Sequence, residues 1–262
     1  MDKYDILRQF EQFAPLVPPA EKFDGNNVII TSDWEIPDVD PRMVTLVRKL
    51  AKAQGIKHLV VAGDFLATDQ ESLTHWTATL AEDYQPTFGS VVRLAKETLK
   101  WMLEDFENVS MIRGNHDDRV AKATKGQVHL GLFLEDLGIS YSQHDHLYLS
   151  TRRGWVKVIH PRQYSRDSLK LGQRFYDVTE KDGEKCHIVI AHTHQAQFGK
   201  SPDKLRDIVA LGCLRDPRRT KYLQRNSATF AGWDQGFLMI KDGYFHPIVL
   251  GQTDLSLYGI SM

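Results

Sequence analysis

The stretch Asn27-Val-Ile-Ile-Thr-Ser-Asp-Trp-Glu35 joins a run of β-branched apolar residues to two carboxylates. A short run of this kind that ends in polar residues is typical of a buried strand in a parallel sheet. Residues 58–63, His-Leu-Val-Val-Ala-Gly, form a second such run. Between them, residues 40–55 have an Asp-Pro start, apolar residues on one helical face and a final glycine. Strand, helix and strand make a βαβ unit, so the sequence predicts an α/β fold with a parallel sheet.

The rest of the chain continues this pattern and then becomes rich in strands. Two helices are expected within residues 70–106, broken near Pro86, followed by a strand at 109–113 and a helical stretch near 117–136. Later strands are expected at 147–150, 155–160, 185–191, 207–211 and 237–241, with a helix at 166–179. Turn residues at Gly154, Asp182-Gly183 and Asp242-Gly243 indicate hairpins. We therefore expect βαβ units first and mostly hairpins afterwards.

Composition and charge are those of an ordinary globular protein. The 262 residues, 42% hydrophobic and 26% charged, suffice for one sizeable core. We expect one domain over residues 1–262, with an irregular lead-in at 1–26 and a helical insertion at 68–106. The net charge of −1 argues against a global basic field for nucleic acid. Two cysteines, a charged start and no bilayer-length apolar run favour a cytoplasmic protein with no membrane partner, and the oligomeric state is left open.

Five short stretches, each directly after a strand-like run, hold most of the metal-binding residue types. The stretches are Asp33-Trp-Glu35, Gly63-Asp64, Gly114-Asn-His-Asp117, His160 and Ala191-His-Thr-His194. Each alone has an ordinary structural explanation, such as a turn aspartate or a surface His-x-His. Parallel sheets, however, bind ligands at the carboxyl ends of their strands, where such side chains can converge. The joint pattern therefore favours one site for a pair of divalent metals.

These stretches resemble the motifs of the calcineurin-like metallophosphoesterases, in the stand-alone form found in phages and bacteria. The family's motifs are Asp-x-His, Gly-Asp-x-x-Asp, Gly-Asn-His-Asp/Glu, a lone His and Gly-His-x-His. The resemblance covers about residues 27–240, and the third and fifth motifs are its most specific parts. It implies a four-layer α/β/β/α sandwich with two mixed sheets.

The resemblance also implies a role for each motif residue. The first metal would be held by Asp33, His194 and a bridging Asp64. The second metal would be held by the same Asp64 together with Asn115, His160 and His192. His116 would be the catalytic imidazole, oriented by a nearby carboxylate such as Asp117.

The chemistry of phosphoester hydrolysis explains these residue types. A phosphoester carries negative charge that repels hydroxide, so the site must supply positive charge and a nucleophile together. Two divalent ions bind phosphate oxygens and lower the pKa of a bridging water from ~15.7 toward ~7. His116 can then protonate the leaving group, which contributes roughly 10²–10⁴ in rate. Two Mn²⁺ ions are the expected occupants, with iron, Mg²⁺ or Zn²⁺ as alternatives.

Two motifs depart from the family pattern. Glu35 stands where the family usually has His, and as a ligand it would lower the net positive charge by one and favour harder ions. The alternative is that Glu35 points away and a water completes the first site. Ala67 and Thr68 replace an acid and an arginine that protein phosphatases of this type carry beside the catalytic histidine. Their absence argues against a protein phosphatase.

Three arginines are candidate substrate-binding residues. Arg162 and Arg166 follow the fourth motif closely, and their guanidinium groups match phosphate oxygens. Arg215 opens the densest basic cluster of the chain, which has a solvated face as its alternative explanation. The other basic residues of that cluster are Arg218, Arg219, Lys221 and Arg225.

The leading function is hydrolysis of a phosphodiester bond, in a nucleotide or nucleic acid, by attack of metal-bound hydroxide with His116 as general acid. One alternative is a phosphomonoesterase, including a protein phosphatase. The other is a weakly active binding module in which the first metal site is degenerate.

Overall fold

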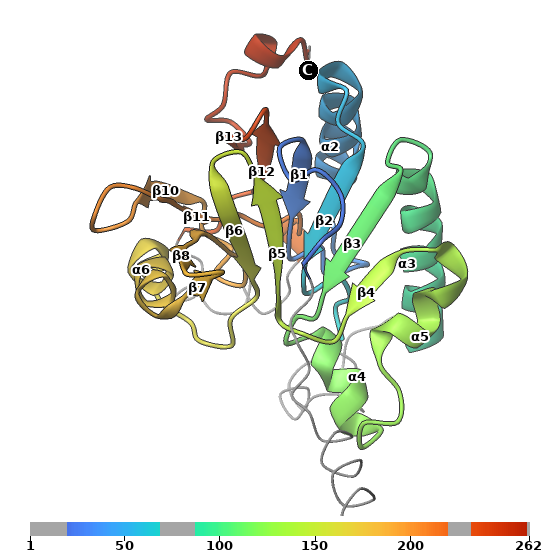
Figure 1. The fold of residues 1–262 in the computed structure, drawn as a ribbon. Helices are drawn as coiled ribbons and strands as arrows, with labels where there is room; N and C mark the ends of the chain where they lie inside the picture. The colour runs from blue at the N-terminus through green and yellow to red at the C-terminus, as the bar shows by residue number, and fades with distance from the viewer. Residues whose placement is uncertain (1–19, 69–86, 220–231, 261–262) are drawn as a thin grey trace, which may run out of the picture.

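The computed structural model describes residues 20–68, 87–219 and 232–260. These residues form two sheets that pack face to face, with helices on the outer face of each sheet (Figure 1). The fold is therefore the predicted four-layer α/β/β/α sandwich with two mixed sheets. Among the described residues, the structure contains no helix with the length and apolar character that a membrane span requires.

The first sheet contains the predicted βαβ unit. Its strand order is β13 (Tyr244–Val249), β12 (Gly236–Lys241), β1 (Val28–Thr31), β2 (His58–Ala62), β3 (Asn108–Ile112) and β4 (Ser140–Ser142). Strands β1 to β4 are parallel, and β12 joins β1 antiparallel. The helices beside this sheet are α2 (Pro41–Gln54), α3 (Phe88–Leu103), α4 (Asp117–Ala123), α5 (Leu130–Leu134), η3 (Glu135–Leu137) and η6 (Leu255–Tyr258).

The second sheet contains five strands and one covering helix. Its order is β10 (Gln197–Lys200), β11 (Asp207–Ala210), β9 (His187–Ile190), β6 (Gly154–Ile159) and β5 (His146–Thr151). The helix α6 (Ser168–Val178) lies on its outer face (Figure 1). The remaining elements are the hairpin β7 (Glu180–Lys181) and β8 (Glu184–Lys185) and the short helix η4 (Pro217–Arg219).

Three apolar cores fill the spaces between the four layers. Successive side chains of a strand point to opposite faces, so each sheet contributes to two cores. In β1, Ile29 packs toward the helices, whereas Val28 and Ile30 pack against the second sheet. In β9, Val189 faces the first sheet and Ile188 faces α6. Both faces of the central strands are therefore buried, which explains their continuous apolar runs.

The helix α2 begins and ends where its sequence predicts. The Asp40 side chain accepts a hydrogen bond from the Arg42 backbone N–H, and Pro41 occupies the first helical position. Gly55 terminates the helix with a φ of 65°, a left-handed conformation that favours glycine. This helix connects β1 to β2, and its apolar face packs on the outer face of the first sheet.

Several sequence predictions are corrected by the structure. The inner strands of the second sheet are not hairpin partners. β6 and β9 are parallel because α6 connects them, and β9 and β11 are parallel because β10 lies between them in sequence and pairs antiparallel with β11. The helical stretch predicted at 117–136 is broken into α4 and α5, and Gly126 has a φ of 81° between them. The helix predicted before Pro86, and residues 1–19 of the lead-in, lie outside the described residues.

The packing of α6 on the second sheet generates a stability prediction. A Cβ atom on Gly172 of α6 would lie 2.4 Å from Cγ2 of the buried Ile208. Gly172→Ala should therefore lower the free energy of unfolding by about 1–3 kcal/mol through overpacking, despite a gain of up to about 1 kcal/mol in helix propensity. Chemical denaturation measures this change.

The matched control is Gly89→Ala in α3, because a Cβ there meets nothing within 4 Å. That substitution should leave the unfolding free energy unchanged or raise it by a few tenths of a kcal/mol. Equal effects of the two substitutions would contradict the close contact between α6 and β11.

Candidate metal centre

All five motifs meet at one end of the sandwich, at the carboxyl ends of β1, β2, β3, β6 and β9. Three groups of side chains place their ligand atoms within 4.8 Å of one another. The groups are Asp64, His160 and His192; Asp33, Glu35 and His194; and Glu35, Asp64 and His116. Strands of both sheets thus contribute ligands, and the core between the sheets fixes their relative positions.

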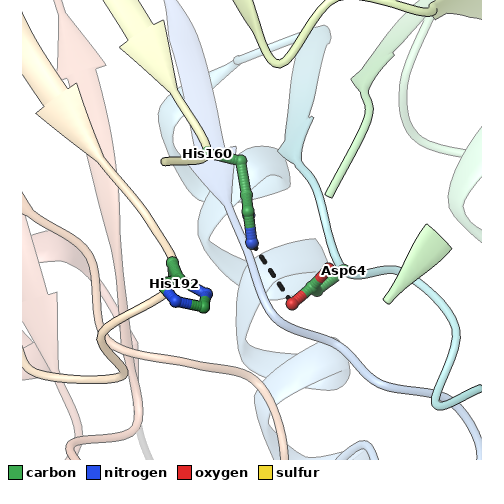
Figure 2. A group of neighbouring side chains, drawn as sticks. All are labelled: Asp64, His160 and His192. Atoms are coloured by element: carbon green, nitrogen blue, oxygen red, sulfur yellow. Dashed lines mark ion pairs between the residues drawn. The ribbon is translucent and has the colours of Figure 1, made fainter. Parts of the chain in front are cut away.

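The first group lies between the two sheets (Figure 2). The Nε2 atom of His160 is 3.2 Å from Oδ2 of Asp64 and 3.1 Å from Oδ1 of Asn115. Its Nδ1 atom lies 2.8 Å from the Ala62 carbonyl oxygen, which can only accept a hydrogen bond. The Nδ1 atom of His160 therefore carries the proton, and Nε2 faces the other ligands as a metal-binding imidazole requires.

The second group gathers two carboxylates around one imidazole. The Nε2 atom of His194 lies 3.1 Å from Oδ1 of Asp33 and 3.3 Å from Oε1 of Glu35. The other oxygen of Asp33, Oδ2, accepts a hydrogen bond from the His192 backbone N–H at 3.1 Å. Glu35 thus points into the site, as a ligand would, and not away from it.

Burial and charge set the protonation of these groups. Burial alone would raise the pKa of Asp64, but the imidazoles of His160 and His116 hold it far below its usual range. Burial likewise opposes protonation of His160, yet the Asp64 carboxylate raises its pKa to about 9. Burial and the neighbouring His160 lower the pKa of His192 to about 4. The site therefore holds an ionised Asp64 carboxylate beside the His160 imidazole, whereas the His192 imidazole is neutral at pH 7.

The backbone at the site is strained. Asp33, Glu35, Asp64, His192 and His194 all have φ between 44° and 77°. Residues other than glycine rarely adopt this left-handed region, and each such residue lowers the free energy of unfolding by about 1–3 kcal/mol. In each Asp-x-Glu and His-x-His pair, the residue in the middle has an ordinary φ. The two outer side chains of each pair therefore point toward the same centre.

Two glycines allow the loops to approach one another. A Cβ on Gly114 would lie 2.1 Å from the backbone nitrogen of Asp64 and 2.2 Å from its Oδ1. A Cβ on Gly63 would lie 2.6 Å from Nδ1 of His160, and Gly63 has a φ of 79°. Glycine is therefore required at both positions by close contact with ligands.

The donor set fits a pair of divalent cations. The described residues bring together three carboxylates, three imidazoles and the Asn115 amide, all of which can ligate a divalent ion. Three buried carboxylates in one place would repel one another without cations to offset them. Asp64 belongs to two of the groups, as a ligand shared by two metals would.

Comparison with known proteins identifies the family. A model of the calcineurin-like phosphoesterase family matches residues 27–228. The chain belongs to the calcineurin-like phosphoesterase family. It is thus a metal-dependent phosphoester hydrolase of a family whose sites hold two metals, which confirms the predicted family and enzyme class. No curated protein matches the chain at a significant level.

Solved structures share the fold at low sequence identity. Yfce, a phosphoesterase from E. coli, has a TM-score of 0.50 and 14% identity, over 86% of this chain and 93% of that chain. A putative diadenosine tetraphosphatase has a TM-score of 0.41 and 16% identity, over 91% of this chain and 100% of that one. The Pseudomonas putida nuclease MPE has a TM-score of 0.35 and 14% identity, over 84% of this chain and 87% of that chain.

His116 of this calcineurin-like phosphoesterase is held beside Asp64. Its backbone N–H donates to Asp64 Oδ1 at 2.7 Å, and its carbonyl oxygen accepts from the Thr68 hydroxyl at 2.6 Å. Its Nε2 atom lies 3.2 Å from a guanidinium nitrogen of Arg119, and its Nδ1 atom lies 3.8 Å from Oε2 of Glu35. The imidazole thus projects into the site from the start of α4.

The structure corrects the role predicted for Asp117. Its Oδ1 accepts from the backbone N–H groups of Phe65 and Leu66, and its Oδ2 accepts from that of Gly114. Both oxygens are therefore engaged by backbone, and the carboxylate does not orient His116. Burial and the Asp64 charge raise the pKa of Asp117 to about 7. Asp117 joins the loops after β2 and β3, which positions the bridging ligand.

Arg215 is also placed differently from its prediction. Its side chain is only 2% exposed, and its guanidinium donates to Oε2 of Glu35 and, at 2.6 Å, to Oδ2 of Asp38. A buried guanidinium behind Glu35 is neither on a solvated face nor available to bind substrate. Arg218 and Arg219 of the same basic cluster are exposed, whereas the residues from 220 to 231 lie outside the described part of the chain.

The other two candidate arginines lie near the rim of the centre. Arg162 is exposed, and its guanidinium donates to the buried Asp118 carboxylate at 2.8 Å. Arg113 pairs with the other oxygen of Asp118 at 2.9 Å. Tyr164, 60% exposed, presents its ring edge-on to His192 at 6.5 Å between centroids. Arg166 is exposed on the same loop, and its substrate-binding role stays a prediction.

Sequence reasoning missed three residues of this phosphoesterase site. Arg119 lies three residues after His116, a helical spacing that could have revealed the contact. Asp118 is adjacent to the third motif, but nothing in the sequence indicates that it holds two arginines. Asp38 shares Arg215 with Glu35 across a separation of 177 residues, a contact for which the sequence offers no signal.

The close approach of Gly114 to Asp64 predicts a metal-binding defect. Gly114→Ala should displace the Asp64 backbone and carboxylate, since neither can move aside from a Cβ at 2.1–2.2 Å. We expect the purified variant to lose most of its bound metal, measured by elemental analysis after dialysis. The Gly89→Ala variant serves as the control and should retain the metal content of the unmodified protein. Full metal content in Gly114→Ala would show that this contact does not position the ligand.

Proposed function

We propose that this phosphoesterase hydrolyses phosphodiester bonds of a nucleotide or nucleic acid. The observation that carries the proposal is the rim beside the metal centre, where a buried carboxylate holds two arginines next to an exposed tyrosine. A phosphodiester has a second substituent that a monoester lacks, and the rim provides a place to bind it. The family match supports phosphoester hydrolysis itself.

Two divalent metal ions are proposed as the cofactors, with Mn²⁺ as the first choice and iron, Mg²⁺ or Zn²⁺ as alternatives. The first would be held by Asp33, Glu35, His194 and Asp64, and the second by Asp64, Asn115, His160 and His192. When bound, the ions would bind phosphate oxygens and lower the pKa of a water molecule. Hard oxygen ligands outnumber imidazoles in the first set, which favours Mn²⁺ or Mg²⁺ there.

His116 is proposed as the general acid. Its ring lies beside the bridging ligand Asp64 and is fixed through its backbone by Asp64 and Thr68. The neighbouring guanidinium of Arg119 lies 3.2 Å from Nε2 and helps to fix the orientation of the ring. A leaving oxygen that departs on this side would receive the proton from the imidazole.

The rim provides the chemistry for recognising the rest of the substrate. The Arg162 side chain is 57% exposed, and its bond to Asp118 limits its rotamers, so a phosphate or sugar oxygen finds a pre-oriented donor. Tyr164 exposes an aromatic face on which a base can stack. A nucleotide carries both groups, which is why we favour it as the substrate class.

The same proposal extends to the organisation of the chain. We propose one metallophosphoesterase domain over residues 1–262 and a cytoplasmic location.

The alternative of a protein phosphatase is disfavoured because Ala67 and Thr68 replace the acid and arginine of those enzymes, and the Thr68 hydroxyl instead supports His116. A binding module with a degenerate first site is disfavoured because Glu35 points into the centre beside His194.

The preference for diesters is tested with two chromogenic substrates. In the presence of Mn²⁺ we expect turnover of bis-p-nitrophenyl phosphate with a higher kcat/KM than that of p-nitrophenyl phosphate. A higher kcat/KM for the monoester would support the phosphomonoesterase instead. Absence of turnover of both substrates, with only one metal bound per chain, would support the binding module with a degenerate first site.

The role of His116 is tested by His116→Ala. We expect kcat for the diester to fall roughly 10²–10⁴-fold, because the leaving group loses its proton donor. Metal content, measured by elemental analysis, should stay at the level of the unmodified protein. His246→Ala, on β13 at the far end of the first sheet, is the matched control and should keep full activity. Full activity in His116→Ala would refute the assignment.

The rim is tested by Arg162→Ala with a dinucleotide and with bis-p-nitrophenyl phosphate. Loss of a charged hydrogen bond should raise KM for the dinucleotide about 3- to 10-fold, with a smaller change for the chromogenic diester. The control is Lys170→Ala in α6, an exposed lysine that pairs with Asp167 outside the centre. Equal KM values for Arg162→Ala and the unmodified protein on the dinucleotide would exclude this subsite.

A further inference from the structure

Glu35, the residue that departs from the family motif, is paired with a buried arginine. The Arg215 guanidinium contacts Oε2 of Glu35, and the two side chains are only 2% and 1% exposed. The other carboxylate oxygen, Oε1, lies 3.3 Å from Nε2 of His194 and faces the first group of ligands. Oε1 of Glu35 therefore faces the first group of ligands, whereas Oε2 contacts the Arg215 cation and lies 3.8 Å from Nδ1 of His116.

We infer that Arg215 is a built-in counter-charge, so that Glu35 and Arg215 together act as one electrically neutral ligand of the first metal. The inference rests on the two-metal centre of the proposed function and assigns Arg215 a positioning role, with no contact to substrate. An imidazole at position 35 would offer one neutral donor atom. The ion pair offers one donor oxygen whose negative charge is cancelled from behind.

The charges of the site show why a counter-charge matters. Asp33, Glu35 and Asp64 carry three negative charges, whereas a histidine at position 35 would leave two. With two divalent cations the net charge is +1 in the first case and +2 in the second. Arg215 returns the total to +2, because its charge lies in the same buried region, where solvent screens it little. The site would thus keep its attraction for a phosphate dianion.

Arg215 also pairs with Asp38, which must be included in the count. The Asp38 side chain is 25% exposed, so solvent screens its charge more than it screens that of Glu35. Nearby, the exposed Arg42 and Arg218 pair with the buried carboxylates of Asp40 and Asp216. Each of these pairs is neutral as a unit, so the Glu35–Arg215 pair dominates the field at the metal position.

The backbone holds Arg215 in register with Glu35. The Arg215 N–H donates to the carbonyl oxygen of Asp33 at 3.1 Å, and the Asp216 N–H donates to that of Asp38 at 2.7 Å. The segment that carries Arg215 is therefore fixed to the loop that carries both Asp33 and Glu35. This geometry keeps the guanidinium behind Glu35 whether or not a metal is bound in front of it.

The test uses metal content and phosphate affinity, without substrate turnover. The proteins are the full chain, Arg215→Met, the double variant Glu35→His/Arg215→Met, and Arg218→Met as the matched control, an exposed arginine that pairs with Asp216. Bound Mn²⁺ per chain is measured by elemental analysis, and inorganic phosphate binding to the Mn²⁺-loaded protein by calorimetry. We expect Arg215→Met to bind phosphate roughly tenfold more weakly, since one nearby positive charge is lost. The control should bind phosphate like the unmodified chain.

The double variant decides between a counter-charge and a purely structural arginine. A neutral imidazole needs no counter-charge, so Glu35→His/Arg215→Met should hold two Mn²⁺ ions and bind phosphate within about threefold of the unmodified chain. If Arg215→Met alone fails to fold or loses one Mn²⁺ ion, the expected behaviour of the double variant still supports the inference. Unchanged phosphate affinity in Arg215→Met at full metal content would overturn it. So would a double variant that fails to fold, lacks a metal, or binds phosphate as weakly as Arg215→Met.

The outcome is independent of the proposed diesterase activity. A protein that binds two Mn²⁺ ions and phosphate as expected, yet hydrolyses no diester, would refute the proposed substrate and leave the role of Arg215 supported. A diesterase whose phosphate affinity does not respond to Arg215→Met would refute the role of Arg215 alone.

Discussion

The buried carboxylate of Asp64 is the constraint on which the rest of the site depends. It is 1% exposed, and an anion in such a place is stable only where cations or hydrogen bonds replace the lost water. Its Oδ1 accepts from the His116 N–H, and its Oδ2 faces the His160 imidazole. These partners come from strands of different sheets. The Asp64 carboxylate therefore requires the two sheets to meet with their carboxyl ends at one point, and Gly114 to carry no side chain beside it.

The strained backbone around this point follows from the same requirement. Five site residues adopt left-handed φ values, and such conformations persist only where the surrounding structure fixes them. The apolar core between the sheets does so, because each strand that ends in a ligand buries both of its faces. Asp117 accepts two hydrogen bonds from the loop after β2 and one from Gly114 in its own loop after β3. Fold stability is thus used to hold ligands in positions that the local sequence would not adopt alone.

Local signals in the sequence predicted much of the fold and the side chains that gather at the candidate metal centre, and non-local contacts explain what they missed. The helix at Pro41–Gln54 was predictable because its cap, its apolar face and its final glycine are close in sequence. The edge strand β10 was missed because alternate side chains are exposed and no apolar run marks it. The partner of Glu35 lies 180 residues away, and only the folded chain brings Arg215 behind it. The parallel interior of the second sheet was missed for the same reason, since pairing depends on where α6 crosses.

The distribution of charge connects these features to function. A net charge of −1 gives the chain no overall attraction for a phosphoester, so the attraction must come from the site. Around the centre, buried carboxylates hold guanidinium groups in place: Asp118 holds Arg113 and Arg162, and Glu35 holds Arg215. In the first case the cation faces the rim, and in the second it lies behind a ligand. The same kind of ion pair thus has two opposite effects. At the rim, the arginines held by Asp118 present positive charge to a ligand, whereas Arg215 offsets the negative charge of Glu35 at the metal position. A glutamate can replace a histidine in the first motif because Arg215 offsets its charge and leaves the net charge of the centre unchanged.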